Sequence, residues 1–359
     1  MWSSRDNKYL VLENTTALLV SKLSKGIALE EISRELSQEL SLPIKETTGF
    51  VLDLKKRFID LDSSRNLNKI EDPKSTAIPE MFGLVKFYKI NELIIKACFE
   101  NEEVCFLIHP KFEHLEVASQ KHDFCFKTFT KKAHIFLAVD HKLIGSWPFE
   151  EIHYFQGKFS MQLIQKIHKK QEDKWLGVFH ASAVSDKKNA MLFLGDSGNG
   201  KSTSLALLQA HGFECIADDF VPVAVQNQDV YSFPAAISIK KTSLDTLLPF
   251  YPELNDSKEY DFKVLQKIVR YLKPNNSDFS NHLPCKGFVF IKYIKDAPLS
   301  CEKIDKIIAF QKLVPDSWLS PIKENAAIFL DWFAASDCFE LTYSNNNEMV
   351  AQVSKLFRD

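Results

Sequence analysis

The sequence is poor in glycine and has no paired cysteine motif. Only 11 of its 359 residues are glycine, against 29 phenylalanines, and this ratio favours well-packed sheets over flexible linkers. The seven cysteines are scattered, without a Cys-x-x-Cys pair or a Cys/His cluster of zinc spacing. Scattered cysteines of this kind predict reduced thiols and a cytoplasmic location.

A long apolar run and an excess of positive charge are also absent from the sequence. The opening residues MWSSRDNKYL lack the apolar centre of a signal peptide, and the most apolar later stretch, 326–335, is short and contains Asp331. We therefore expect no membrane partner. The formal net charge is -2, so no basic surplus is present to hold a nucleic-acid backbone, and nucleic acid is not an expected partner.

The apolar pattern predicts a mixed α+β and α/β chain. Residues 1–62 predict one strand over 8–13 and three small helices. Residues 63–80 are polar, contain two prolines and have the composition of a linker. Short apolar runs, 104–108 among them, predict a mainly antiparallel β region over 81–174. Residues 175–359 alternate between strand and helix patterns, with a predicted helix over 261–272.

The strongest motif of the sequence is a phosphate-binding loop. The segment fits G-x-x-x-x-G-K-[ST], with an apolar strand before it and a helical stripe after it. Backbone N–H groups of such a loop point at phosphate oxygens, and the helix that follows adds its N-terminal partial charge. The motif predicts that ATP binds at Gly195, Asp196, Ser197, Gly198, Asn199, Gly200, Lys201, Ser202 and Thr203. We expect Lys201 to reach the β and γ phosphates and the Ser202 hydroxyl to ligate Mg²⁺.

Two aspartates and an upstream histidine are the candidate catalytic residues. Asp218 and Asp219 follow the short apolar strand 214–217. At a strand end, one carboxylate can hold Mg²⁺ while the other takes a proton from an attacking hydroxyl. An Asp-Asp turn is the alternative. His180 begins a strand pattern ahead of the loop, and by itself a lone histidine more often has a place in the core.

The stretch 179–225 resembles the catalytic domain of HPr kinase/phosphorylase. The resemblance rests on His180-Ala181, on the loop GDSGNGKS and on Asp218-Asp219, which stand at that family's spacing from Lys201. It implies that Asp218 is the base on a substrate hydroxyl, that Asp219 and Ser202 serve the metal, and that His180 contacts the phosphate or metal region. HPr kinases are hexameric. The resemblance therefore leaves a homo-oligomer open, although no residue pattern marks an interface.

The sequence departs from the bacterial HPr kinases at two places. Thr203 replaces their glutamate, and the segment 232–241 replaces their second, Arg-Gly-rich signature. That signature is tied to HPr binding and dephosphorylation, so its absence argues against HPr as the substrate. Lys240 or Lys241 could reach a phosphate or a substrate anion, and a solvated pair at a strand end is the equal alternative.

Residues 8–61 resemble a PqqD-like domain, a small winged-helix fold that captures leader peptides of ribosomally made, modified peptides. The resemblance rests on the runs 9–14, 18–19 and 29–32, on Gly26, and on 50–58. It implies that a leader peptide adds as a strand beside the first sheet strand and lies against the third helix. The implied contacts are Tyr9, Leu10, Val11, Leu12, Phe50, Leu54 and Phe58. A small accessory or dimerisation domain is the alternative.

These features lead to three hypotheses for the function. The first is an ATP- and Mg²⁺-dependent kinase that phosphorylates a Ser or Thr hydroxyl on a precursor peptide held by the N-terminal domain. The second is a kinase of a small hydroxylated metabolite. The third is a non-catalytic, ATP-responsive module that binds peptides.

Overall fold

The computed structural model describes residues 1–3, 6–59, 76–262 and 267–359. The chain divides into two compact units, Met1–Glu71 and Asp72–Asp359. Most of the predicted linker 63–80 lies outside the described residues, and the boundary between the units falls within it. Among the helices that the structure describes, none combines the length and the apolar character needed to cross a bilayer.

The N-terminal unit is a three-helix cluster with a small β ribbon. Its elements are β1 (Trp2–Ser3), β2 (Lys8–Tyr9), α1 (Asn14–Ser24), α2 (Leu29–Leu40) and α3 (Ile44–Phe58). The predicted strand over 8–13 is shorter in the structure, because only Lys8 and Tyr9 pair with β1. Apolar residues at helical spacing meet at the centre of the unit, where Leu19, Leu23, Ile32, Leu36, Val51 and Leu54 are buried.

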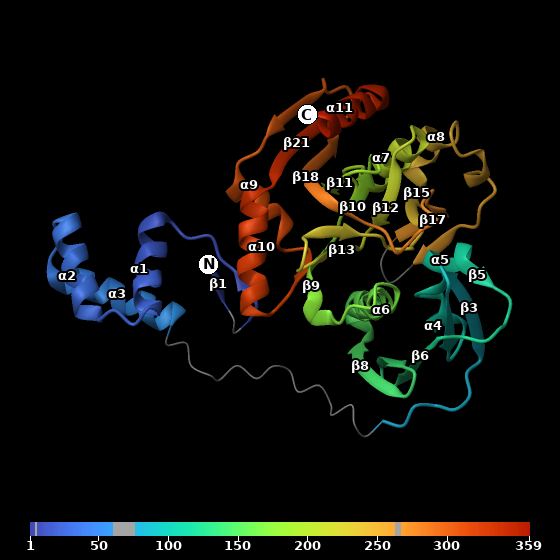
Figure 1. The fold of residues 1–359 in the computed structure, drawn as a ribbon, viewed down its shortest axis with the longest axis horizontal. Coiled ribbons are helices and arrows are strands. Elements are labelled where there is room, and N and C mark those ends of the chain that lie inside the picture. The colour runs from blue at the N-terminus through green and yellow to red at the C-terminus, as the bar shows by residue number, and fades with distance from the viewer. Residues whose placement is uncertain (4–5, 60–75, 263–266) are drawn as a thin grey trace. The chain divides into compact units, whose positions relative to one another are not determined.

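The second unit begins with a six-stranded sheet in the order β5-β3-β4-β6-β7-β8. The strands are β3 (Leu84–Ile90), β4 (Leu93–Phe99), β5 (Glu116–Val117), β6 (Phe124–Lys131), β7 (His134–Val139) and β8 (Lys142–Pro148), and the helices are α4 (Glu102–Phe106), α5 (His109–Phe112) and α6 (Ile152–Ile167). The sheet is mixed, because β4 and β6 run parallel. α6 packs on it, with the rings of Phe159 and Phe126 5.0 Å apart (Figure 1).

The strand predicted over 104–108 is wrong. The structure has α4 there, and the Asn101 side chain accepts a hydrogen bond from the Val104 amide at its N-terminus. A short apolar run cannot be assigned to a strand or a buried helix from its pattern alone. The capping asparagine decides in favour of the helix.

A ten-stranded sheet forms the centre of the second unit. Along it the strands follow the order β12-β10-β11-β18-β14-β13-β9-β20, and β21 pairs with both β18 and β19. Its strands are β9 (Trp175–Phe179), β10 (Ser182–Ser185), β11 (Ala190–Leu194), β12 (Glu214–Asp218), β13 (Val221–Ala224), β14 (Asp229–Tyr231), β18 (His282–Tyr293), β19 (Ser300–Lys303), β20 (Ser317–Leu319) and β21 (Asp337–Tyr343). β11 runs parallel to β18, and β18 runs parallel to β21.

Helices α7 (Lys201–Ala210), α8 (Leu244–Leu247), α9 (Lys306–Leu313), α10 (Lys323–Ala335) and α11 (Asn346–Arg358) belong to the same unit. α7 lies by β10 and β12 (Figure 1). Its residues Leu205 and Leu208 share a buried cluster with Phe193 of β11 and Val353 of α11. The core therefore fixes the start of α7, and with it the phosphate loop, at the end of β11.

The helix predicted over 261–272 is also wrong. The structure has β16 (Tyr260–Phe262) and β17 (Lys267–Leu272), which form a three-stranded sheet with β15 (Ile237–Lys240), and residues 263–266 lie outside the described residues. Apolar spacing in this segment suits a helix. Its β-branched and aromatic residues instead pair with the neighbouring strands.

Candidate functional site

The predicted phosphate loop lies between the end of β11 and the start of α7. Gly195, Gly198 and Gly200 have positive φ values of 148, 101 and 92°, which side chains rarely allow. One hydrogen bond ties the loop to β18, because the Tyr293 amide donates to the Asn199 carbonyl at 3.2 Å. A second bond closes the loop on itself, because the Asn199 amide donates to the Asp196 carbonyl at 3.1 Å. The strand, loop and helix predicted from the motif are therefore all present.

Gly195 is the most constrained residue of the loop. A Cβ at this position would lie 2.7 Å from the backbone oxygen of Ile291. We expect Gly195→Ala to distort the loop and to lower ATP affinity by about five- to 150-fold, since strained backbone of this kind costs ~1–3 kcal/mol. Calorimetric titration with ATP measures the effect. Gly49→Ala is the matched control, because Gly49 lies in α3 with open space around it; an equal loss of affinity in both variants would contradict the account.

Lys201 is the first residue of α7 and is largely buried. Its ammonium group donates to the Gly195 carbonyl inside the curl of the loop. Burial lowers the pKa of Lys201, and the nearby carboxylates of Asp219 and Asp218 oppose that effect. The ammonium group is thus held within the loop, where an incoming phosphate can replace the carbonyl as its partner.

Asp218 ends β12 and is 2% exposed. Its Oδ1 accepts hydrogen bonds from Ser182 at 2.6 Å and from Ser202 at 3.2 Å, and its Oδ2 accepts from the Ser238 amide at 3.1 Å. Burial, followed by the neighbouring Asp219 carboxylate, raises the pKa of Asp218, and the three donors oppose the shift. Asp218 is therefore tied to Ser202, the hydroxyl that the motif assigns to the metal.

Asp219 directly follows β12 and has a φ of 63°. Its Oδ2 lies 3.9 Å from Lys111 Nζ and 3.7 Å from Lys267 Nζ. Burial by itself would raise the pKa of Asp219, but Lys111 and Lys267, together with His180 and Lys201, hold it well below its ordinary value. This carboxylate therefore stays charged at neutral pH.

A cavity of about 430 Å³ joins most of the predicted residues. Its lining includes His180, Asp219 and seven residues of the loop, namely Asp196, Ser197, Gly198, Gly200, Lys201, Ser202 and Thr203. Asp218 is not among its lining residues. Of the two aspartates, Asp219 is thus the one that a molecule in the cavity would meet.

Lys240 and Lys241, the two lysines that could reach a phosphate or a substrate anion, differ in their position relative to the cavity. Lys240 ends β15, lines the cavity, and donates to the Ser197 hydroxyl at 2.8 Å. Lys241 is exposed and does not line the cavity. The structure therefore brings Lys240 to the phosphate loop, and it leaves Lys241 outside.

Several residues at the site had no signal in the sequence. Ser182 and Ser238 hold Asp218 from neighbouring strands, and Lys111 and Lys267 reach Asp219 from α5 and β17. Ser182 lies two residues after His180, which was the nearest available clue. Lys111 lies in the middle region, for which the sequence offered no motif.

The residues of the N-terminal unit that are predicted to bind a peptide differ in their exposure to solvent. Val11 and Phe50 are 43% and 46% exposed, whereas Leu54 is 5% exposed and Phe58 packs against the same core. Tyr9, Leu10 and Leu12 are half-buried. The direct peptide contact predicted for Leu54 does not fit its burial.

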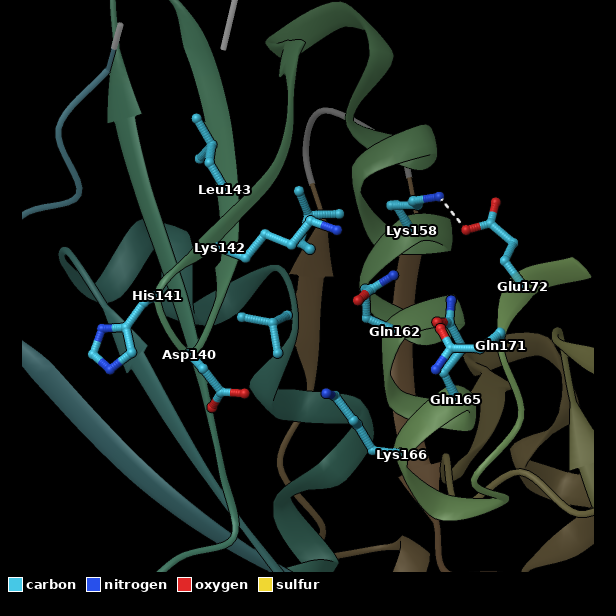
Figure 2. A pocket seen from close by; sticks show the side chains of 12 residues that line it. Asp140, His141, Lys142, Leu143, Lys158, Gln162, Gln165, Lys166, Gln171 and Glu172 are labelled. Carbon is cyan, nitrogen blue, oxygen red and sulfur yellow. Dashed lines mark hydrogen bonds and ion pairs between the residues drawn. The ribbon is translucent and has the colours of Figure 1, made fainter. Parts of the chain in front are cut away.

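A second cavity, of about 710 Å³, lies between the β7–β8 turn and α6 (Figure 2). Lys158 of α6 is paired with Glu172 at 2.6 Å, and Lys142 belongs to β8. The side chains of α6 that line the cavity are those of Lys158, Gln162, Gln165 and Lys166. The described residues supply no hydrogen-bond partner for the buried Gln165 Nε2 atom. None of the predicted phosphate-site residues lines this cavity.

Comparisons with known proteins found a distant structural similarity. No protein-family model matches the chain, and no curated protein matches it. Among solved structures, the chain is similar to the Hpr(Ser) kinase/phosphatase from Coxiella burnetii, with 12% identity and a TM-score of 0.22. The match covers 50% of this chain and 93% of the other. At that TM-score, functional statements rest on the residues of the site.

Proposed function

We propose that this protein is an ATP-dependent phosphotransferase that phosphorylates a hydroxyl group of a peptide. The observation that carries the proposal is the cavity in which the loop 195–202 and the charged Asp219 lie together, with Asp218 bonded to Ser202 behind them. Such a loop suits a nucleotide's phosphates, and a carboxylate beside it suits an attacking hydroxyl. The sequence resemblance to HPr kinases agrees with this chemistry.

The oxygen donors at the loop fit a magnesium ion. Mg²⁺ in nucleotide sites usually takes one or two protein oxygens and fills its other positions with water and phosphate. The Ser202 hydroxyl and the Asp218 carboxylate, 3.2 Å apart, are donors of this type. The described residues contain no cluster of three or more metal-ligating side chains, which fits an ion held jointly with a nucleotide. When bound, Mg²⁺ would neutralise charge on the phosphates.

We propose that the two aspartates have the reverse of the roles implied by the resemblance. Asp218 is bonded to Ser202, the hydroxyl that the motif assigns to the metal, and this bond supports a place beside the metal. Asp219 lines the cavity, which supports contact with the acceptor hydroxyl. The pKa directions alone would favour Asp218 as the stronger base, but a base must first reach the proton. In a loose phosphoryl-transfer transition state the hydroxyl keeps its proton until the new O–P bond is nearly complete, and that proton is then acidic enough to pass to a carboxylate of low pKa.

The protein's own residues then account for each part of the reaction. Lys201 moves from the Gly195 carbonyl to the phosphates, and the loop amides hold the remaining oxygens. Asp219 accepts a hydrogen bond from the acceptor hydroxyl and takes its proton as the new O–P bond forms. The bond between the γ phosphorus and the ADP oxygen breaks, and ADP leaves with the electron pair.

The peptide part of the proposal is supported by the exposed apolar side chains of the N-terminal unit. We expect Phe50→Asp to raise the KM for a peptide substrate about tenfold without changing kcat, because a buried aromatic contact is worth ~1.4 kcal/mol or more. Leu52→Asp is the matched control, since Leu52 is also exposed on α3. Steady-state kinetics with peptide and ATP varied separately test this. If the two variants raised the KM for the peptide equally, or if neither raised it, the result would contradict a contact between Phe50 and the peptide.

A further inference from the structure

Two lysines next to Asp219 are not used by the phosphate loop. Lys111 belongs to α5, and its carbonyl accepts a hydrogen bond from the Ala236 amide at 2.8 Å, just ahead of β15. Lys267 begins β17. Both ammonium groups lie within 3.9 Å of Asp219 Oδ2, although they come from segments far apart in the chain.

Neither ammonium group makes a direct hydrogen bond to Asp219. The two Nζ atoms lie 3.7 and 3.9 Å from its Oδ2 atom. Lys201 and Lys240 lie at the loop, where they contact Gly195 and Ser197. Among the described residues, Lys111 and Lys267 are thus the lysines whose ammonium groups lie within 4 Å of the Asp219 carboxylate.

An acidic group on the acceptor would meet two ammonium groups beside Asp219 that make no direct hydrogen bond to its carboxylate. Lys267 and Asp219 line the cavity, and Lys111, which is not among its lining residues, keeps a partly exposed side chain. The exposed fractions are 31% for Lys111, 28% for Lys267 and 22% for Asp219.

We infer that Lys111 and Lys267 bind an acidic group carried by the acceptor close to its hydroxyl, so that the substrate is an acidic peptide segment. This inference rests on the proposed function and adds the class of its substrate. The middle region 81–174 thereby contributes to substrate choice through α5. A carboxylate bound by two lysines gives charge-assisted contacts, which are stronger than neutral ones.

The test uses a serine peptide library in which one flanking position at a time is varied. With ATP and Mg²⁺, the full-length protein should phosphorylate peptides with Asp or Glu next to the serine about tenfold faster than their Asn or Gln counterparts. Lys111→Gln and Lys267→Gln should each reduce this preference, and the double variant should abolish it. Lys241→Gln, at an exposed lysine outside the cavity, should retain it. Circular dichroism checks that each variant is folded.

Two results would overturn the inference. One is a wild-type protein without acidic preference, and the other is a double variant slowed equally on acidic and neutral peptides, which would place the lysines at the transferred phosphoryl group. A separate binding measurement keeps the inference distinct from the proposed function. A dye-labelled peptide with aspartates beside an alanine in place of the serine should bind about tenfold more tightly than its asparagine counterpart, by fluorescence anisotropy. If no peptide is phosphorylated but the tighter binding of the aspartate peptide depends on Lys111 and Lys267, the kinase proposal fails and the binding site for an acidic group stands. If the two peptides bind equally, the proposed binding site fails.

Discussion

Asp219→Asn should lower the rate of phosphoryl transfer by about 100- to 10,000-fold, the usual contribution of a general base. The amide still accepts a hydrogen bond, but it cannot take a proton. Asparagine tolerates the left-handed backbone that Asp219 adopts, with its φ of 63°, so the fold should be preserved. Rapid-quench measurement of a single turnover tests the rate, and calorimetry should show unchanged ATP affinity.

Asp218→Asn provides the contrast that separates the two carboxylates. The amide in this variant would keep one oxygen for both Ser182 and Ser202, but its NH₂ group would face the Ser238 amide donor and it would carry no charge beside the proposed metal. We therefore expect this variant to need a higher Mg²⁺ concentration and to recover activity as Mg²⁺ is raised, whereas Asp219→Asn should not recover. If Mg²⁺ instead rescued Asp219→Asn, the result would support the roles that the sequence resemblance implies, with Asp218 as the base and Asp219 at the metal.

Lys201→Met should reduce transfer by about 100- to 1,000-fold, which is the usual cost of losing one preorganised donor to a developing charge. Methionine matches most of the lysine's length and suits its buried surroundings, so the effect reports the lost ammonium group. We also expect weaker ATP binding and an unchanged affinity for AMP, which lacks the β and γ phosphates. Calorimetric titration with both nucleotides measures this difference.

Lys241→Met is the control for the loop lysine. Lys241 is exposed and lies outside the cavity, so its loss should leave both ATP affinity and transfer within about twofold of the wild type. If Lys201→Met and Lys241→Met behaved alike, the phosphate site would have to lie elsewhere in the molecule.

Local patterns were enough to predict the strand, the loop and the helix around residues 195–202 from the sequence. The required glycines, the lysine and the serine stand in one short segment, and the apolar residues on both sides identify the strand and helix. The mixed α and β character of the chain also followed from apolar periodicity. The segments 104–108 and 261–272 were assigned wrongly, because a capping residue decides the first and pairing with distant strands decides the second.

The surroundings of the two aspartates could not be predicted in the same way. Asp218 is the last residue of β12, whereas Asp219 follows the strand with a left-handed φ of 63°, so the alternation of side chains along a strand does not tell which of the two faces the cavity. The lysines at Asp219 come from α5 and from β17, and neither has a motif or a fixed spacing from the loop. Only the folded arrangement brings these charges together.

The most direct test of the account follows the γ phosphate itself. ATP labelled with oxygen-18 on its γ phosphate is incubated with the protein, Mg²⁺ and a mixture of serine and threonine peptides, and the products are separated by mass spectrometry. The account predicts labelled phosphate esterified to peptide hydroxyls, in an amount that falls to background with Asp219→Asn. Label found solely in unreacted ATP or in free phosphate, with ATP binding intact, would contradict it.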